Sequence, residues 1–554
     1  MLDGVVPFPP EYAARYRQKG YWEDKSLAAV FDEIFLKFAD RVAIVAHPER
    51  ITYRDLSQRS ERLALHLIKL GIKPLDRVVV QLPNVPEFVY LYFALQKVGA
   101  IPVMALPPHR YREVRHFVDA AKAVAYACPD RLGDFSFTEM AEKIQKECPC
   151  LRFVLVVGEN VPPGFISLRK LLAEDSGLSP DVLNHIHIDP TDPAVFQLSG
   201  GTTGVPKLIP RTHNDYAYNS KIAGAAVDIQ PQDALLLVLP VAHNLPLACP
   251  GIQGFLMRGA RAVLSTSTQP KDVFPLIERE KVTHLAVVPA LLIKWINDPS
   301  IGQYDLSSVR VVQSGGQRLQ PEVRRKTEDL IPSAKVIENF GMAEGLLTFV
   351  RRDDPEEVRM ETVGRQICPD DEVKLVDDEG LEVPDGEVGE LACRGPYTLR
   401  GYYHAPEHNA RAFTPDGFYL TGDLMRRHPS GNYIVAGRKK DLINRGGEKI
   451  SAEEIENLIL GHPAVQNVAC APMPDPVLGE RTCAFIIPKP GSTVTLQELV
   501  RFLLEAGIAK YKLPERVELM DEFPLSHFGK VSKATLTKQV TEKMAKEAPA
   551  QPRP

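Results

Sequence analysis

The segment that most constrains the fold is a ten-residue run rich in glycine and hydroxyl side chains, Leu198-Ser-Gly-Gly-Thr-Thr-Gly-Val-Pro-Lys207. It lies between two apolar runs, 194–198 and 208–210, and therefore predicts a tight loop between two strands. Glycines let the backbone turn sharply and approach a ligand, while hydroxyls and a lysine supply donors and charge. This chemistry suits a polyphosphate, and the candidate contacts are Ser199, Gly200, Gly201, Thr202, Thr203, Gly204 and Lys207.

The loop differs from a Walker A loop, in which Gly-Lys-Ser/Thr opens a helix. Lys207 follows Pro206, and Pro210 comes close behind it, so we expect no helix to start at this point. Composition alone leaves the alternative of a flexible loop without a ligand. The loop by itself therefore indicates a nucleotide without proving one.

Strand patterns and helix patterns alternate through the first half of the chain. A helix is predicted over 86–98, and strands over 77–82, 99–104, 262–264, 284–288 and 309–312. This alternation predicts an α/β fold, with a large N-terminal domain of parallel-rich sheets flanked by helices.

The pattern of predicted elements changes after about residue 360. Short alternating strands with turn residues at 377–380 and 429–432 predict an antiparallel, barrel-like β subdomain. A compact α+β segment follows, with a helix over 451–460 that Ser451 caps three residues ahead of Glu454.

Bulk composition excludes several classes of function. A chain of 554 residues is too long for one core and predicts two to four domains or subdomains. Its 66 basic and 71 acidic residues leave a net charge of −5, so the chain lacks the excess of positive charge that would indicate binding to nucleic acid or an anionic membrane. No apolar run has the length of a membrane span or a signal peptide. Eight cysteines without a metal or redox spacing favour reduced thiols and a cytoplasmic location.

Five further motifs follow the glycine-rich loop: 242–244 (AHN), 338–344 (ENFGMAE), 419–423 (YLTGD), 437–441 (GRKKD) and 524–530 (PLSHFGK). In this order they resemble the adenylate-forming superfamily of acyl-CoA synthetases, luciferases and peptide-synthetase adenylation domains. The resemblance covers residues 8–540. Within the superfamily, the chain is similar to stand-alone aryl-acid adenylating enzymes of siderophore biosynthesis.

The resemblance implies a layout as well. The N-terminal adenylation core is expected over 1–439 and a small mobile C-terminal domain over 440–545, with a hinge at Lys440 and a disordered tail over 546–554. No carrier segment follows Lys530. The acyl acceptor is therefore expected to be a separate aryl carrier protein with a phosphopantetheine thiol.

The family reaction uses ATP and Mg²⁺ to join a carboxylate to AMP, and then transfers the acyl group to a thiol. By resemblance, Lys530 is the cation at the transferring phosphate, Glu344 is the Mg²⁺-associated acid, and His243 belongs to the catalytic set. A lysine is a flexible point charge, and a hard cation prefers carboxylate oxygen. Ala343 departs from the threonine common before this glutamate, which we interpret as a marker of the aryl-acid branch.

The remaining nucleotide contacts are also carried over by resemblance. Asp423 is expected to accept hydrogen bonds from the ribose hydroxyls, with Arg438 supporting it. The adenine and the nearby phosphates are expected to contact two further segments, Gly315, Gly316 and Gln317 in the first, and Glu338, Asn339, Phe340 and Gly341 in the second.

The acid pocket is expected to include His243, Asn244, Cys249, Gly315 and Leu347. Amino-acid-loading relatives carry an aspartate at the position of Asn244, and a neutral amide suits a phenolic hydroxyl instead. Relatives that activate 2,3-dihydroxybenzoate usually have serine at the position of Cys249 and valine at that of Leu347. The sequence therefore favours salicylate first and 2,3-dihydroxybenzoate second.

Two alternatives remain at this point. An aryl- or acyl-CoA ligase, which transfers its adenylate to free coenzyme A, would carry the same adenylation motifs. A catalytically silent nucleotide-binding protein would have had no reason to keep Lys207, Glu344, Asp423 and Lys530 together.

Overall fold

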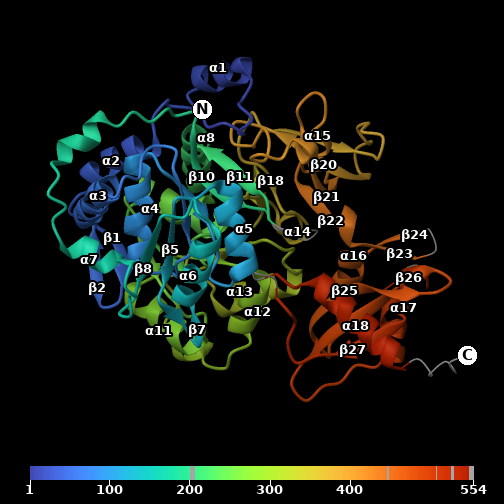
Figure 1. Cartoon of the computed structure of the whole chain (residues 1–554). Helices are drawn as coiled ribbons and strands as arrows, with labels where there is room; N and C mark the ends of the chain where they lie inside the picture. Colours follow the sequence, from blue (N-terminus) through green and yellow to red (C-terminus); the bar gives the residue numbers. More distant parts are fainter. Residues whose placement is uncertain (200–205, 446–447, 507, 509, 526–529, 548–554) are drawn as a thin grey trace, which may run out of the picture.

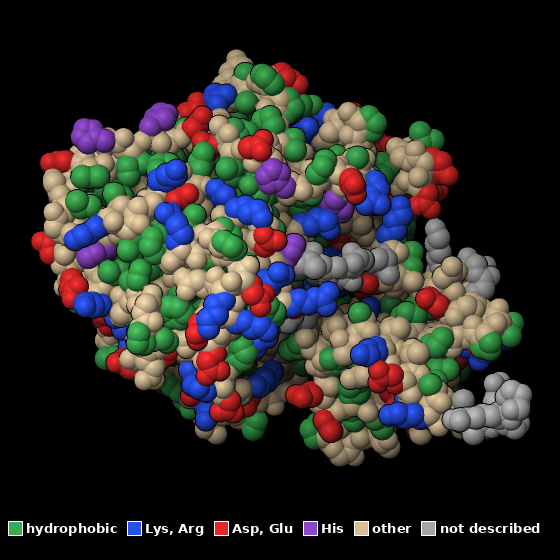
Figure 2. Space-filling model, in the orientation of Figure 1, with side chains coloured by type: hydrophobic (Ala, Val, Ile, Leu, Met, Phe, Trp, Pro, Cys, Tyr) green, Lys and Arg blue, Asp and Glu red, His purple; other side chains and the backbone are tan. Residues whose placement is uncertain are grey.

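The computed structural model of the chain describes residues 1–199, 206–445, 448–506, 508, 510–525 and 530–547 (Figure 1). A large lobe (residues 1–438) and a small lobe (residues 442–547) are joined by the short 3-10 helix η3 (Lys439–Asp441). The small lobe stands apart as a separate body in the space-filling view, where acidic and basic side chains are interspersed over the visible face (Figure 2).

Two sheets form the centre of the large lobe. One has the strand order β18-β17-β16-β15-β14-β12-β13-β1-β2, and the other β11-β10-β4-β3-β5-β8-β9. The first contains β1 (Val42–Ala46), β2 (Glu49–Thr52), β12 (Ala234–Leu237), β13 (Arg261–Leu264), β14 (His284–Val287), β15 (Val311–Gly315), β16 (Lys335–Met342), β17 (Gly345–Phe349) and β18 (Arg365–Gln366). The second contains β3 (Arg77–Val80), β4 (Ile101–Met104), β5 (Ala125–Pro129), β8 (Phe153–Val157), β9 (Ile166–Ser167), β10 (Pro193–Leu198) and β11 (Leu208–Thr212).

Neighbouring strands are parallel in the middle of both sheets, and antiparallel pairs occur at the edges, where β2, β11, β17 and β18 join. The predicted α/β class with parallel-rich sheets is therefore confirmed. The predicted strands agree with β3, β4, β13, β14 and β15 to within three residues at each end, and the predicted helix over 86–98 is α4 (Pro86–Val98).

Helices lie in three layers, because successive strand residues point to opposite faces. Val78 and Val80 pack into the cluster between the two sheets, whereas Val79 packs on the outer face of the second sheet. Leu236 of β12 likewise faces outward while Leu235 and Leu237 face the shared layer.

The shared layer between the sheets contains α2 (Leu27–Lys37), α3 (Tyr53–Lys69), α4, α8 (His213–Ala226), α9 (Asn244–Ala248) and α10 (Gly251–Met257). The outer layers contain α5 (Tyr111–Ala121) and α6 (Phe137–Glu147) on one side, and α11 (Pro270–Glu280), α12 (Pro289–Ile296) and α13 (Pro321–Leu330) on the other. Peripheral elements are α1 (Pro10–Gln18), β6 (Arg131–Leu132), β7 (Phe135–Ser136), α7 (Leu168–Ala173), η1 (Pro180–His185), η2 (Ile301–Gln303), α14 (Glu356–Glu361) and α15 (Pro406–Ala412). Among the helices described, none is both long and apolar enough to cross a membrane.

An antiparallel sheet ends the large lobe, as predicted from the turn-rich sequence. Its order is β19 (Glu372–Val376), β20 (Val388–Arg394), β21 (Tyr419–Arg427) and β22 (Tyr433–Arg438). The predicted turn at 377–380 is closed by Asp377, whose carboxylate accepts from the Glu379 and Leu381 amides at 3.0 and 2.8 Å.

The small lobe has its own sheet and its own core. It contains β23 (Leu442–Arg445), β24 (Glu448–Ser451), α16 (Ala452–Ile459), β25 (Val465–Asp475), β26 (Gly479–Pro488), α17 (Leu496–Glu505), η4 (Lys510–Lys512), β27 (Arg516–Leu519) and α18 (Lys533–Glu547). As predicted, Ser451 caps α16 by accepting from the Glu454 amide. The two hydrophobic clusters of the small lobe contain only residues of this lobe.

The predicted start of the tail at Lys546 is wrong. Helix α18 continues to Glu547, because Arg516 of β27 forms two contacts of 2.8 Å with the Glu547 carboxylate. The rest of the predicted tail, 548–554, lies outside the described residues.

Candidate active site

The glycine-rich loop connects two antiparallel neighbours, β10 and β11, whose last pair is Leu198 with Leu208. Two hydrogen bonds close the loop: Ser199 N donates to Lys207 O at 3.0 Å, and Lys207 N donates to Ser199 Oγ at 2.9 Å. The loop therefore leads into a strand, as predicted, and opens no helix. The predicted contacts Gly200, Gly201, Thr202, Thr203 and Gly204 lie outside the described residues.

Lys207 and the acidic motif face the same region. The Lys207 ammonium lies 5.9 Å from the centre of the Tyr402 ring, and the Tyr402 hydroxyl donates to Glu344 Oε1 at 2.8 Å. Tyr419 of β21 adds a hydroxyl contact of 2.8 Å to Tyr402. Burial raises the pKa of Glu344, whereas the Tyr402 hydroxyl and the charge of Arg438 oppose that shift. Tyr402 thus contacts both the Lys207 ammonium and the Glu344 carboxylate.

Asp423 and Arg438 are register partners in β21 and β22. Arg438 Nε lies 2.8 Å from Asp423 Oδ1, and the Asp423 amide donates to Thr421 Oγ1 at 3.0 Å. The pair holds a buried carboxylate beside the Glu344 region, since both Asp423 and Arg438 act electrostatically on Glu344. The role of this pair at a ribose stays a prediction.

The candidate adenine surface lies at the ends of β15 and β16, where Gly315 pairs with Asn339. A Cβ atom on Gly315 would lie 2.7 Å from Asn339 Oδ1, so a larger residue there would displace the Asn339 side chain. Gly316 has φ +88°, a conformation that also favours glycine. Gly315 is buried, Gly316 is exposed and the neighbouring Gln317 is partly buried.

Glu338 does not reach this surface with its side chain. Its carboxylate binds Arg318 and Arg324 and accepts from the Leu319 amide at 2.8 Å, and it is fully buried. Since neighbours along a strand point to opposite faces, Glu338 lies on the face of β16 away from Asn339. We therefore correct its assignment from a nucleotide contact to part of the framework.

The other residues of this motif pack on either side of β16. Phe340 packs against the cluster of the antiparallel sheet. A Cβ on Gly341 would lie 2.5 Å from Leu347 Cδ2, so Leu347 of β17 covers the glycine directly. Leu347 is 1% exposed and belongs to the central hydrophobic cluster.

Lys530 comes from the small lobe and contacts the large one. Its Cε atom would lie 3.4 Å from a Cβ on Gly316. It also acts on His243: burial, and then the charge of Lys530, lower the pKa of His243 to about 4. His243 is thus neutral near pH 7, and its Nδ1 accepts from the Leu245 amide at 3.3 Å as the N-cap of α9.

The candidate acid pocket is uncharged at its selective position. Asn244 Oδ1 accepts from the Tyr216 hydroxyl at 2.8 Å, and Asn244 Nδ2 lies 3.1 Å from Cys249 Sγ. Asn244 and Cys249 are 5% and 2% exposed. Gln313 Nε2 links this pocket to the adenine surface by donating to Cys249 O at 2.8 Å and Asn339 Oδ1 at 3.1 Å.

Sequence reasoning missed the buried groups that hold these residues in place. They are Gln197, Arg211, Asp215, Tyr216, Asn219, Gln313 and Tyr402. One signal was present: Arg211 stands in an otherwise apolar strand with Asp215 four residues later, and the two form an ion pair of 2.8 Å. The carbonyl of Ala343 accepts from Arg211 at 2.9 Å, so the departure at this position is tied into the same network.

The predicted hinge lies in η3, which includes the backbone of Lys440. The neighbouring Lys439 forms ion pairs with Glu390 at 2.9 Å and Asp378 at 2.8 Å, both in the large lobe. The side chain of Lys440 is outside the described part of the chain.

Comparison with known proteins decides the family. The profile of AMP-binding enzymes matches residues 31–403, and that of the AMP-binding enzyme C-terminal domain matches residues 454–530. The chain belongs to the AMP-binding enzyme family. The predicted membership of the adenylate-forming superfamily is therefore confirmed.

Relatives of this AMP-binding enzyme span its full length. A salicylyl-CoA synthase / salicylate adenylyltransferase of a Streptomyces species is 47% identical, covering 96% of this chain and 97% of the relative. A 2,3-dihydroxybenzoate-AMP ligase of Bacillus subtilis is 46% identical, with coverage of 98% and 99%. The apo structure of MbtA from Mycobacterium smegmatis is 39% identical and superposes with a TM-score of 0.74, covering 97% and 99%. The aryl-acid AMP ligase branch of the family is thus confirmed.

Proposed function

We propose that the enzyme activates salicylate with ATP and then transfers the salicyl group to the phosphopantetheine thiol of an aryl carrier protein in siderophore biosynthesis. In the first step a carboxylate oxygen attacks the α-phosphorus, and pyrophosphate leaves. In the second step the sulfur of a thiol attacks the acyl carbon and gives up its proton to solvent, the bond between the acyl carbon and the phosphate oxygen breaks, and AMP leaves with the electrons of that bond.

One observation carries the proposal: the Lys530 side chain lies next to Gly316 and its charge acts on His243, which the neutral Asn244 follows directly. A positive charge thus lies next to an aryl-acid pocket that has an amide where an amino-acid pocket would need a carboxylate. Because His243 is neutral, Lys530 supplies the positive charge on this side of the site. Its charge would stabilise the negative charge that develops on the transferring phosphate.

Asp423 and Arg438 would orient the ribose, and Gly315, Gly316 and Asn339 would receive the adenine. The carboxylate of Asp423 accepts hydrogen bonds in a buried position, and Arg438 holds it at 2.8 Å. Ser199 and Lys207, at the two ends of the closed loop, would border the triphosphate.

The residues fit a magnesium ion shared with the nucleotide. Among the described residues, no group of three or more His, Cys, Asp or Glu could hold a metal by itself. Mg²⁺ usually binds one or two carboxylates together with substrate phosphates, so Glu344 alone suffices on the protein side. When bound, the ion would neutralise phosphate oxygens; the chain's own part is to keep Glu344 in place through Tyr402.

Position 249 supports salicylate over 2,3-dihydroxybenzoate. A thiol is a weak hydrogen-bonding group, whereas a second ring hydroxyl would need a strong partner. Leu347 covers Gly341 closely, and we expect its extra methylene to narrow the ring pocket as well. The discrimination is expected to be about 1–3 kcal/mol, which gives a preference and leaves the second acid as a substrate.

The acceptor has one competing candidate. The Streptomyces relative is named both a salicylyl-CoA synthase and a salicylate adenylyltransferase, so free coenzyme A is the alternative thiol. Comparing salicyl transfer to coenzyme A and to an aryl carrier protein decides between them.

ATP–pyrophosphate exchange tests the substrate. The panel contains salicylate, 2,3-dihydroxybenzoate, benzoate, an α-amino acid and a fatty acid, and exchange should be strongest with salicylate. In Cys249→Ser, kcat/KM for 2,3-dihydroxybenzoate relative to salicylate should rise about 10-fold, because a hydroxyl can bind the second ring hydroxyl. An unchanged ratio would remove Cys249 from the ring pocket, and exchange with only the fatty acid would refute the aryl-acid proposal.

A further inference from the structure

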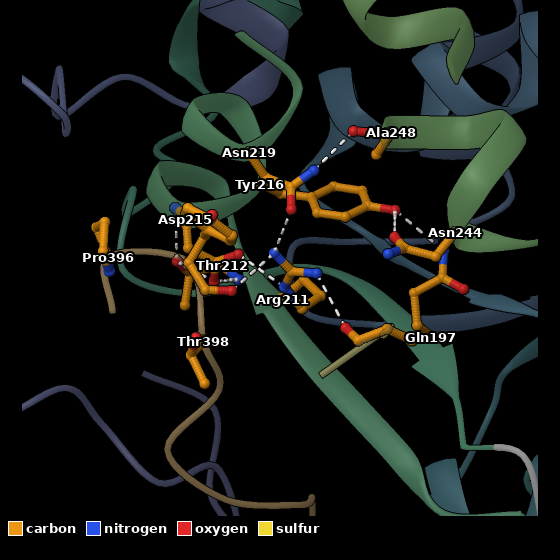
Figure 3. A network of polar contacts seen from close by, with 12 residues as sticks. Gln197, Arg211, Thr212, Asp215, Tyr216, Asn219, Asn244, Ala248, Pro396 and Thr398 are labelled. Atoms are coloured by element: carbon orange, nitrogen blue, oxygen red, sulfur yellow. Dashed lines mark hydrogen bonds and ion pairs between the residues drawn. The ribbon is translucent and has the colours of Figure 1, made fainter. Parts of the chain in front are cut away.

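A relay of buried hydrogen bonds includes Asn244 of the candidate acid pocket (Figure 3). Gln197 Nε2 donates to the Tyr216 hydroxyl at 3.1 Å, and Tyr216 in turn donates to Asn244 Oδ1 at 2.8 Å. Asn244 Nδ2 then faces Cys249 Sγ at 3.1 Å. The four residues come from β10, α8, α9 and the residue after α9, and each is at most 5% exposed. The relay therefore connects three elements through buried side chains.

The direction of the Asn244 amide is fixed by its neighbours. The Tyr216 hydroxyl accepts from Gln197 Nε2 and donates its own proton to Asn244, so the end of the amide that faces Tyr216 is the carbonyl oxygen, and the end that faces the Met342 carbonyl at 3.5 Å is the NH₂ group. One proton of the NH₂ group points to Cys249, and the second has only the distant Met342 carbonyl within the described structure. The contact with the Met342 carbonyl is the longer of the two, so a bound acid with a closer acceptor would take this second proton.

Asn219 is fixed in the same way. Its Nδ2 donates to the Ala248 carbonyl at 2.6 Å, and its Oδ1 accepts from Arg211 at 3.3 Å. The same Nδ2 lies 3.6 Å from Cys249 Sγ. Two amide groups therefore aim N–H donors at one thiol, and this side of the pocket is rich in donors.

Arg211 holds Tyr216 in place. Its guanidinium lies 4.8 Å from the centre of the Tyr216 ring, and it binds Asp215 at 2.8 Å and the Tyr397 carbonyl at 3.0 Å. With the ring clamped in this way, the hydroxyl of Tyr216 has one position, against Asn244. Figure 3 shows the ring reaching from α8 to Asn244.

We propose that Tyr216 is a positioning residue for substrate selection: by donating to Asn244 Oδ1, it locks the amide with its N–H toward the acid. The pocket then selects an ortho substituent that accepts a hydrogen bond, such as a hydroxyl or phenolate oxygen, and disfavours an ortho amino group. The inference rests on the proposed function, because it needs an aryl acid bound next to Asn244. It assigns Tyr216 no contact with the reacting atoms.

The test compares salicylate with 2-aminobenzoate in Tyr216→Phe. Phenylalanine keeps the ring but removes the donor, which leaves a buried carbonyl without a partner and frees the amide to rotate. The ratio of kcat/KM for salicylate over 2-aminobenzoate should fall about 10-fold, a size typical of a lost orienting hydrogen bond. The KM for ATP should stay unchanged.

Tyr218→Phe is the matched control, because it removes a hydroxyl from the same helix. Tyr218 donates to Cys368 Sγ at 3.3 Å and takes no part in the relay. The ratio of kcat/KM for salicylate over 2-aminobenzoate in Tyr218→Phe should therefore equal that of the wild type. Gln197→Leu provides a second variant, which removes only the donor to Tyr216 and should shift the ratio in the same direction by less. It decides the matter if Tyr216→Phe is not stable.

The outcomes separate the inference from the proposed function. A wild type that does not prefer salicylate over benzoate overturns the proposed function and the selection together. If the wild type has that preference, and the ratio of kcat/KM for salicylate over 2-aminobenzoate in Tyr216→Phe is within twofold of the wild-type ratio, only the role of Tyr216 is overturned. An equal loss with both acids would mean that Tyr216 is merely structural.

Discussion

At the scale of single residues, we expect the Lys530 ammonium to supply the positive charge at the transferring phosphate. The lysine is held beside Gly316 and lowers the pKa of a buried histidine that is already neutral. In Lys530→Ala, adenylate formation measured by pyrophosphate exchange should fall about 100-fold or more. The variant loses a preorganised positive charge that would stabilise the negative charge developing on the transferring phosphate. Transfer of salicyl from supplied salicyl-AMP to the acceptor thiol should be retained.

Lys538→Ala is the control for that experiment. Lys538 lies in α18 of the same lobe, is 76% exposed, and pairs with Glu542 at 3.8 Å. Its removal should leave both steps unchanged. Equal loss of both steps in Lys530→Ala would contradict a charge that serves only the first step.

Residue identities in the site were predictable from motifs, but their partners were not. Lys530, Glu344, Asp423 and Asn244 stand out by sequence because their neighbours form recognisable runs. Glu338 stands in such a run too, yet two arginines from distant segments neutralise it. Whether such a residue contacts the nucleotide or supports the fold depends on its burial and on partners from distant segments, and neither can be predicted from the neighbouring residues in the sequence.

At the scale of elements, the strands and helices could be predicted from the spacing of apolar residues, because a period of 2 or of 3.6 residues reflects which side of a strand or helix is buried. The pairing order of strands was not predictable, because β12 lies between β13 and β14 and β1 joins β13 from far away in the chain. The end of α18 was missed for a similar reason: it depends on Arg516, from another element.

The segment between β18 and β19 contains a buried acid whose titration should be visible in stability. Asp371 is 4% exposed, and burial raises its pKa to about 8, against the hydrogen bond donated by Tyr397. The unfolded chain releases this proton near the ordinary value, whereas the folded protein keeps it. Stability is therefore expected to fall as the pH rises toward about 8 and to change little from this group above it.

Asp371→Asn removes that dependence. The melting temperature of the variant, minus that of the wild type, should increase from about pH 5 to about pH 8.5. Asp370→Asn is the contrast, because Asp370 pairs with Lys19 at 2.7 Å and its loss should not stabilise the protein at any pH. A temperature difference for Asp371→Asn that is constant across this range would contradict the raised pKa.

At the scale of the whole molecule, the orientation of the two lobes is the one that brings Lys530 to the site (Figure 1). Ser451 Oγ donates to Ala436 O at 2.6 Å near η3, and Gln320 Nε2 donates to Asn457 Oδ1 at 2.5 Å farther away. These two hydrogen bonds, between described residues of the two lobes, would have to break for the small lobe to rotate about the predicted hinge at Lys440. Sequence could give both lobes but not their relative orientation, which depends on such weak contacts.

Locking this orientation should separate the two steps of the reaction. Gln320→Cys and Asn457→Cys place thiols on facing sides of the lobes, and a short bis-maleimide would join them. The joined enzyme should still form the adenylate, because Lys530 stays in place, but it should lose transfer to the acceptor thiol, which needs the rotation. Each single-cysteine variant treated with the reagent controls for reaction at Cys150, the native cysteine that is only partly buried. Transfer by the joined enzyme at the rate of the untreated double variant would show that the thiol reaches the adenylate with the lobes as they stand.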